Sequence, residues 1–150
     1  MRSSATLTII WTKPEIGLEE WEFIAHPAKQ SFYRRHGITW KHILDAFDGS
    51  TLTPWPRGGE ISGIPVAGSY HTYDDYICYL ARSKRGYRRN YTLMEEALQR
   101  TGELVLPAPI ILACNGEGLL FAGWRRLCLA WNYGMIPGVW LVQLAGGGLS

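Results

Sequence analysis

The sequence lacks the cysteine and histidine patterns of a metal centre or of a disulfide scaffold. Its three cysteines, Cys78, Cys114 and Cys128, are odd in number and widely spaced, without a CxxC pair. None of the histidines has the HExxH spacing of a zinc protease. We therefore expect neither a zinc site nor a disulfide framework, and the unpaired thiols favour a reducing, cytoplasmic setting.

Long hydrophobic runs are also missing. The N-terminal region holds only the short apolar run Leu7–Trp11, which is shorter than the core of a signal peptide, and no later stretch approaches the length of a membrane span. The sequence thus predicts a soluble protein without a membrane partner.

A strong charge of one sign is a third absence. Fifteen Lys and Arg residues against thirteen Asp and Glu give a formal charge of +2, which does not argue for nucleic-acid binding. Any such argument must come from local clusters of charge.

What the chain does have is enough apolar material for a core, with 47% hydrophobic residues in 150. This size predicts a single domain over residues 1–150. In the first half, β-rich and helix-spaced segments predict a strand at Thr6–Thr12, helices at Ala28–His36, Trp40–Phe47 and Thr72–Lys84, and a long loop at Asp48–Ser69 with short strand pieces near Ile61 and Ile64–Val66.

The second half of the sequence has clearer signals for the ends of helices and for turns. A capping-box pattern, Thr92 with Glu95, predicts the start of a helix that Gly102 closes. Beyond it we expect a hairpin of strands Pro109–Cys114 and Leu119–Ala122 around the turn Asn115-Gly116, a helix at Arg125–Tyr133 ended by Gly134, and a strand at Val139–Leu144.

The segment Gly123-Trp124-Arg125-Arg126 lies where the second hairpin strand feeds this helix. A strand that ends in glycine and leads into a helix aims free backbone N–H groups and the positive end of the helix dipole at one point. Two arginines stand there, and the guanidinium fork binds two oxygens at once. These residues predict an anion site, most plausibly for phosphate, whereas a solvated arginine pair is the plainer alternative.

Over about fifty residues the segments ALQRTGELVLPAPIIL and LLFAGWRRLCLAWNYGMIPGVWLV resemble the ParB/sulfiredoxin-like superfamily. The resemblance lies in the order of helix, glycine, Pro-Ile strand, Gly-x-Arg-Arg turn, helix, glycine, proline and strand. It implies an α/β (α+β) fold with a mixed sheet and flanking helices. Residues 92–144 would form the superfamily core and residues 1–91 an N-terminal elaboration.

In that superfamily the glycine-to-arginine turn holds nucleotide phosphates, of CTP in ParB and of ATP in sulfiredoxin. The resemblance therefore implies that Gly123, Trp124, Arg125 and Arg126 bind a nucleoside triphosphate, ATP or CTP, together with Mg²⁺. Trp124 stands where sulfiredoxin carries its reactive cysteine, which argues against sulfiredoxin chemistry.

Phosphate transfer needs a carboxylate or histidine to serve the acceptor. The residues that we expect in this role are His71, Asp74 and Glu15; Glu19, Glu20, Asp75 and Glu117 are further acidic candidates, each of which alone is more often a surface residue.

The run Arg82–Arg89 is the strongest local charge bias in the chain. Cations with an interleaved tyrosine suit a nucleic-acid backbone and a stacked base, although an exposed helix end and connector would have the same composition. The residues predicted to contact nucleic acid are Arg82, Lys84, Arg85, Tyr87, Arg88 and Arg89.

Three functions fit these features. The first is an NTP-dependent phosphotransferase or NTPase that acts on a hydroxyl acceptor, for which DNA or a modified DNA base is one option. The second is a non-catalytic, nucleotide-gated DNA-binding module of a plasmid or phage system. The third is a ParB-like nuclease, against which the absence of a clear cluster of metal-binding carboxylates counts.

Overall fold

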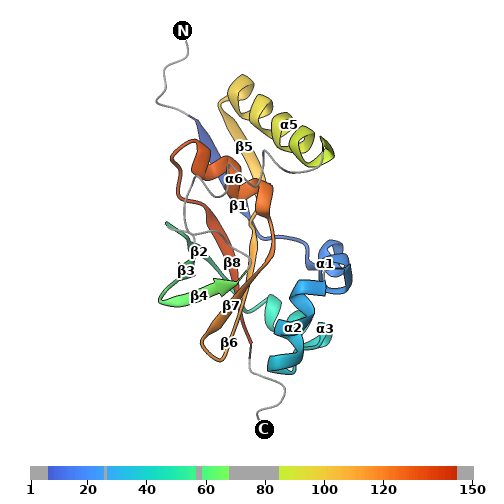
Figure 1. Ribbon diagram of the computed structural model, residues 1–150. Coiled ribbons are helices and arrows are strands. Elements are labelled where there is room, and N and C mark those ends of the chain that lie inside the picture. The colour runs from blue at the N-terminus through green and yellow to red at the C-terminus, as the bar shows by residue number, and fades with distance from the viewer. Residues whose placement is uncertain (1–6, 26, 57–58, 68–84, 145–150) are drawn as a thin grey trace.

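The protein has a mixed α/β fold in a computed structural model (Figure 1) that describes residues 7–25, 27–56, 59–67 and 85–144. At positions 25, 27–28, 67, 85–90 and 124 it describes the backbone alone. The elements, in chain order, are β1 (Thr8–Thr12), the 3-10 helix η2 (Ile16–Glu19), α1 (Glu20–Ala25), α2 (Pro27–His36), α3 (Trp40–Phe47), β2 (Thr51–Pro54), β3 (Glu60–Ile61), β4 (Ile64–Ala67), α5 (Arg85–Thr101), β5 (Glu103–Pro107), β6 (Ile110–Cys114), β7 (Glu117–Ala122), α6 (Trp124–Asn132) and β8 (Gly138–Leu144).

The described strands form two sheets. The larger has the order β2-β8-β6-β7-β4-β3, in which β6 runs antiparallel to β7 and parallel to β8. The smaller is the parallel pair β1-β5. Since β5 continues through Ala108 and Pro109 into β6, the two sheets share one stretch of chain, and the Ala108 N–H donates to the Thr12 carbonyl at 2.8 Å.

The large sheet is covered on both faces, because side chains of its central strand alternate between two separate cores. Ile111 and Ala113 of β6 pack with Leu98 of α5 and Leu127 of α6. Residues of the opposite parity pack with α2 and α3; they are Ile110, Leu112 and Cys114, against Phe32, Tyr33, Ile43 and Phe47. The sequence of a strand that is buried on both faces is a continuous apolar run, as it is in Ile110–Cys114.

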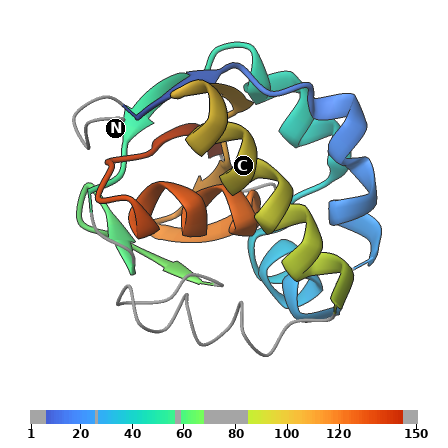
Figure 2. The ribbon, with the colours of Figure 1, turned by 90° about the horizontal axis from the view of Figure 1, so that it is seen from above.

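The helices therefore form two groups. Figure 1 shows α1, α2 and α3 gathered together and away from α5 and α6. Figure 2, seen from above, shows α5 and α6 running side by side. The β6-β7 hairpin contributes to both cores and so connects the two groups.

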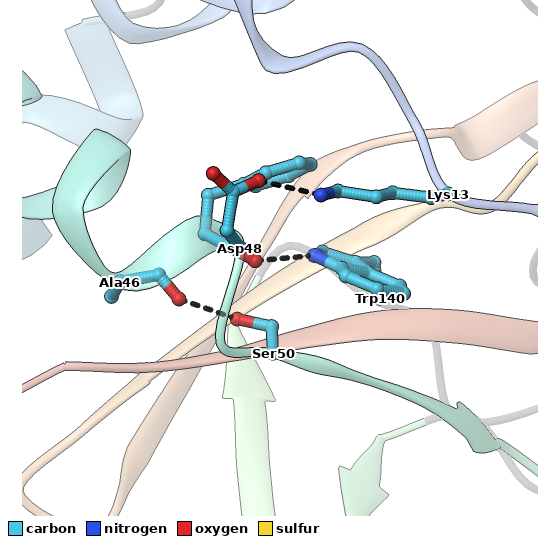
Figure 3. A network of polar contacts seen from close by, with 6 residues as sticks. Lys13, Ala46, Asp48, Ser50 and Trp140 are labelled. Atoms are coloured by element: carbon cyan, nitrogen blue, oxygen red, sulfur yellow. Dashed lines mark hydrogen bonds and ion pairs between the residues drawn. The ribbon is translucent and has the colours of Figure 1, made fainter.

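The end of α3 is fixed by the polar contacts in Figure 3. The Trp140 indole of β8 donates to the Phe47 carbonyl at 3.0 Å, and the Ser50 hydroxyl donates to the Ala46 carbonyl at 2.9 Å. Lys13 forms an ion pair with Asp48 at 2.5 Å. These contacts hold the chain after β1, the end of α3 and strand β8 in one arrangement.

Most predicted elements are confirmed, with two differences. Helix α5 begins at Arg85, well before Thr92, so the Thr92–Glu95 capping box does not start it. Packing decides this boundary, because Tyr91, inside the helix, is buried in the core with Leu98. The predicted loop Asp48–Ser69 contains the additional strand β2, whose hydrogen bonds come from β8.

Other elements were not foreseen or cannot be compared. Strand β5 and the helical segments η2 and α1 have no counterpart in the sequence prediction. The predicted helix Thr72–Lys84 lies outside the described residues. None of the described helices is long and apolar enough to cross a membrane.

Candidate functional site: the turn at the start of helix α6

The turn between β7 and α6 requires glycine for two reasons. Gly123 is the N-cap of α6 and has φ 110° and ψ 21°, a left-handed conformation that L side chains rarely adopt. A Cβ atom at this position would lie 2.4 Å from the Cβ of Pro109. The cap supplies no side-chain hydrogen bond, so the first turn of α6 keeps N–H groups that have no intrahelical acceptor.

The strand that leads into this turn is irregular. Ile110 pairs with Ala122 but Ile111 pairs with Leu120, so Phe121 is an extra residue in the ladder, a β-bulge. The Lys29 ammonium of α2 donates to the Phe121 carbonyl at 2.6 Å and lies over the Phe121 ring. A lysine from a distant helix thus binds the bulge two residues before Gly123.

The two predicted arginines both lie in the first turn of α6. The Arg126 guanidinium donates to the Pro107 carbonyl at 2.8 Å, which directs it toward the end of β5. Burial lowers the pKa of Arg126 from its ordinary value, and the charge of Glu19 opposes that shift. Arg125 is partly exposed, and its charge also acts on Arg126. Trp124 is the first residue of the helix.

Glu19, at the end of η2, is the carboxylate whose charge has the largest effect on the pKa of Arg126. Burial raises the pKa of Glu19 above its ordinary value, the Arg126 charge opposes this, and Glu22 and Lys29 contribute smaller effects in opposite directions. Within the described part of the chain, the Glu19 side chain makes neither a hydrogen bond nor an ion pair. A half-buried carboxylate near cations but bonded to none of them is available to react or to bind.

Deeper in the same region lies a buried ion pair. Lys29 is 3.1 Å from Glu22 Oε2, and their side chains are only 12% and 8% exposed. Burial lowers the pKa of Lys29, and Glu22 opposes the shift. The neighbouring Tyr33 hydroxyl is buried and has no hydrogen-bond partner among the described residues. Burial and, to a lesser extent, the Glu22 charge raise the pKa of Tyr33.

The segment that carries these carboxylates departs from the usual amphipathic pattern at several positions, although its Ile16 and Phe23 pack against the core. Glu22 is buried and Glu19 half-buried, whereas Leu18, Trp21 and Ile24 are 70%, 51% and 69% exposed. A sequence selected only for folding places apolar residues inside and carboxylates outside. Local conflicts of this kind concentrate at functional sites.

The residues predicted as acid–base groups are not brought to this turn. Glu15 is the N-cap residue of η2 and its side chain is exposed. His71 and Asp74 lie outside the described residues. Glu19, which the sequence offered only as a further candidate, is the residue that the structure brings to Arg126. Sequence spacing gave no reason to prefer it, since Glu19 and Arg126 are more than a hundred positions apart.

The predicted nucleic-acid residues fall in two groups. Arg85, Tyr87, Arg88 and Arg89 lie in the first turns of α5, and Arg82 and Lys84 lie outside the described residues. Helix α5 is bonded to the far end of α6. There Glu95 accepts from the Tyr133 hydroxyl at 2.9 Å and from the Asn132 amide at 3.3 Å.

A second polar cluster lies at the other end of β7. Glu117 accepts from Arg35 at 2.6 Å, and His36 Nε2 lies 3.0 Å from its second oxygen. The hydrogen bond from Arg35 is the main cause that holds the Glu117 pKa below its ordinary value. The other ring nitrogen of His36 is 3.2 Å from the Asn115 amide. Because the Glu117 carboxylate contacts both Arg35 and His36 of α2, this cluster holds α2 against the hairpin turn.

Among the described residues, no group of three or more His, Cys, Asp or Glu side chains is arranged to hold a metal ion. A magnesium ion that accompanies a nucleotide needs only one or two protein carboxylates, because the phosphates and water complete its shell. Comparisons with known protein families, curated proteins and solved structures found no match for this chain. The ParB/sulfiredoxin resemblance therefore stays a prediction.

Proposed function

We propose that the protein is an NTP-dependent phosphotransferase that binds the nucleotide phosphates at the Gly123 turn. The observation that carries the proposal is the left-handed Gly123 turn with Arg125 and Arg126 in the first turn of α6, where the charge of Arg126 interacts with the half-buried carboxylate of Glu19. ATP or CTP with Mg²⁺ is the expected donor.

The electrostatics favour a polyanion at this place. Arginines in the first turn of a helix oppose its dipole, an arrangement that costs stability unless an anion compensates it. The helix start has no side-chain cap that would satisfy its N–H groups. A phosphate group would accept hydrogen bonds from the N–H groups and would be attracted by the charges of Arg125 and Arg126.

Glu19 is the proposed acid–base group. The hydroxyl oxygen of the acceptor would attack the terminal phosphorus, the bond from that phosphorus to the bridging oxygen would break, and the nucleoside diphosphate would leave. Glu19 would take the hydroxyl proton, a role that suits a carboxylate whose pKa is raised by burial. Magnesium would neutralise charge on the phosphates.

Binding is tested first by thermal unfolding of the protein with ATP, CTP, GTP or UTP plus Mg²⁺. A nucleotide that binds only the folded state raises the melting temperature. Arg126→Ala should weaken binding by about 1.5–3 kcal/mol, as expected for a lost charge-assisted hydrogen bond. Arg34→Ala, an exposed arginine of α2, is the matched control and should bind as wild type does. The proposal fails if no nucleotide raises the melting temperature.

Turnover is tested with Glu19→Gln. This variant should still bind the nucleotide, because glutamine retains size and polarity, but it should lose transfer to a hydroxyl acceptor and any slow hydrolysis. Equal rates in Glu19→Gln and wild type would remove Glu19 from the chemistry while leaving the binding site standing.

A nucleotide-gated nucleic-acid-binding module is the second candidate. It is favoured by one observation: the helix that contains Arg85, Arg88 and Arg89 is bonded through Glu95 to Asn132 and Tyr133 at the end of α6. A ligand at the start of α6 could thus act on α5 through a short helix. Nucleotide-dependent affinity for DNA without turnover would select this function.

A further inference from the structure

The Lys29–Glu22 pair is costly to bury, and stability alone does not explain it. Taking two charges out of water has a penalty that their attraction offsets only when the geometry is excellent, and apolar replacements are often as stable. Both side chains are nearly inaccessible, and within the described part of the chain the Tyr33 hydroxyl beside them has no hydrogen-bond partner. A role in holding another group in place would account for the pair.

What Lys29 holds is the carbonyl of the bulged residue. Phe121 is the extra residue between the pairs Ile110–Ala122 and Ile111–Leu120, and the Lys29 ammonium is 2.6 Å from its oxygen. A buried carbonyl that leaves the regular ladder needs a donor from elsewhere. Lys29 supplies that donor.

The bulge lies immediately before the turn. From Phe121 the chain passes through Ala122 to Gly123, whose left-handed conformation and contact with Pro109 leave little freedom. Bulges bend a strand and redirect the residues that follow. The direction of the β7 end thus sets where the first N–H groups of α6 point.

We propose that Lys29 is the positioning residue of the phosphate turn: by binding the bulged Phe121 carbonyl it fixes the path of the chain into Gly123, while Glu22 holds its ammonium group in place. This role rests on the proposed function, since the turn must be aimed only if it binds phosphate. Lys29 is assigned no contact with the nucleotide.

The test compares Glu22→Gln with the double variant Glu22→Gln/Lys29→Met. Lys29→Met alone removes the ammonium that pairs with the buried Glu22 carboxylate and can fail to fold, whereas the double variant removes both charges. Of the two variants compared, Glu22→Gln keeps the Lys29 donor to the Phe121 carbonyl and the double variant removes it. Two quantities are measured below the melting temperature of every variant: affinity for the nucleotide that stabilises wild type, and amide hydrogen exchange of Leu127, whose N–H donates to the Gly123 carbonyl at 3.0 Å.

We expect the double variant to bind nucleotide roughly tenfold or more weakly than Glu22→Gln, because a small misplacement of binding groups has large effects, and its Leu127 amide to exchange faster. Equal affinity, with or without faster exchange, would overturn the positioning role. Weaker binding with unchanged exchange would also overturn it, since Lys29 would then act on the phosphate directly.

Two controls separate positioning from general damage. Lys41→Met removes an exposed lysine that pairs with Asp45 at 2.8 Å, and should alter neither quantity. Ile61→Ala, a buried residue of the edge strand β3, should lower stability without weakening nucleotide binding. If wild type binds no nucleotide, the proposed function fails, and Leu127 exchange alone decides whether Lys29 fixes the turn.

Discussion

At the scale of single residues, Gly123 and Gly134 offer a matched comparison. Both have positive φ, of 110° and 69°, but only at Gly123 would an added Cβ meet another residue, Pro109. Gly134→Ala should cost about 1–2 kcal/mol, for left-handed strain alone. Gly123→Ala adds overpacking and should cost about 2–5 kcal/mol in all. Denaturant unfolding of both variants measures the difference, and equal costs would show that Pro109 yields without strain.

Glu19 allows a prediction with a definite sign. Burial raises its folded-state pKa above the ordinary 4.5, so the folded protein holds this proton more tightly than the unfolded chain. The ionised carboxylate therefore costs stability above that raised pKa, and the cost disappears as pH falls to 4.5 and below. Glu19→Gln should be more stable than wild type at pH 7, with a gain that shrinks on acidification.

Thermal unfolding across pH checks the Glu19 prediction, with Glu15→Gln as the control because that side chain is exposed. Destabilisation by Glu19→Gln at pH 7 would mean that attraction to Arg126 outweighs burial. A variant that is more stable but inactive would be the usual sign of a site that trades stability for activity.

The residue scale also shows what the sequence could reveal about the site. The placement of Arg125 and Arg126 in the first turn of a helix after Gly123 is a local property, so the pattern Gly-Trp-Arg-Arg predicted it, whereas the contact of Gly123 with Pro109 appears only in the fold. No local pattern distinguishes Glu19 from Glu15, because only the packing of η2 against the rest of the chain decides which carboxylate is half-buried.

At the scale of elements, helix α3 has a full capping box. Thr39 Oγ1 accepts from the His42 N–H at 3.2 Å, and His42 Nδ1 accepts from the Thr39 N–H at 3.0 Å. Thr39→Ala should therefore destabilise the protein by about 1 kcal/mol, while Thr39→Ser retains the acceptor and should cost much less. Chemical denaturation distinguishes the two, and equal losses would assign the effect to the threonine methyl group.

Elements with strong local signals were predicted well. Trp40–Phe47 is a helix with the predicted bounds, and Asn115 and Gly116 form the hairpin turn with φ 53° and 78°. The start of α5 was missed because burial of Tyr91 extends the helix beyond its apparent cap. Strand β5 was missed because its identity depends on pairing with β1, a hundred residues away in sequence.

At the scale of the whole molecule, the Lys29–Glu22 pair joins α1 and α2 to the central hairpin. Lys29→Met breaks the ion pair of a buried carboxylate and should cost about 3–5 kcal/mol, the usual penalty for breaking a buried pair. Glu22→Gln/Lys29→Met should cost markedly less. Urea unfolding of both variants gives the comparison, and equal costs would mean that the Lys29–Phe121 bond, not charge pairing, is the larger stabilising contact.

The residues around Lys29 and Arg126 come from distant parts of the chain, which explains why the sequence alone could not predict that they lie together. Glu19, Glu22 and Lys29 come from the N-terminal helices, and Phe121 and Arg126 from the far end of the chain. Each residue is ordinary in its local context. Only the tertiary fold brings Glu19, Glu22, Lys29 and Arg126 close enough for their charges to interact.

The contact between Trp55 and Trp131 has a spectroscopic consequence. Trp55 is fully buried after β2, Trp131 belongs to α6, and the ring centroids are 5.3 Å apart at 66°. Two indoles this close couple electronically and should give a circular-dichroism signal in the ultraviolet absorption of tryptophan. Because one indole is anchored beside the sheet and the other moves with α6, the protein carries a built-in optical probe of any shift of that helix, readable without a label.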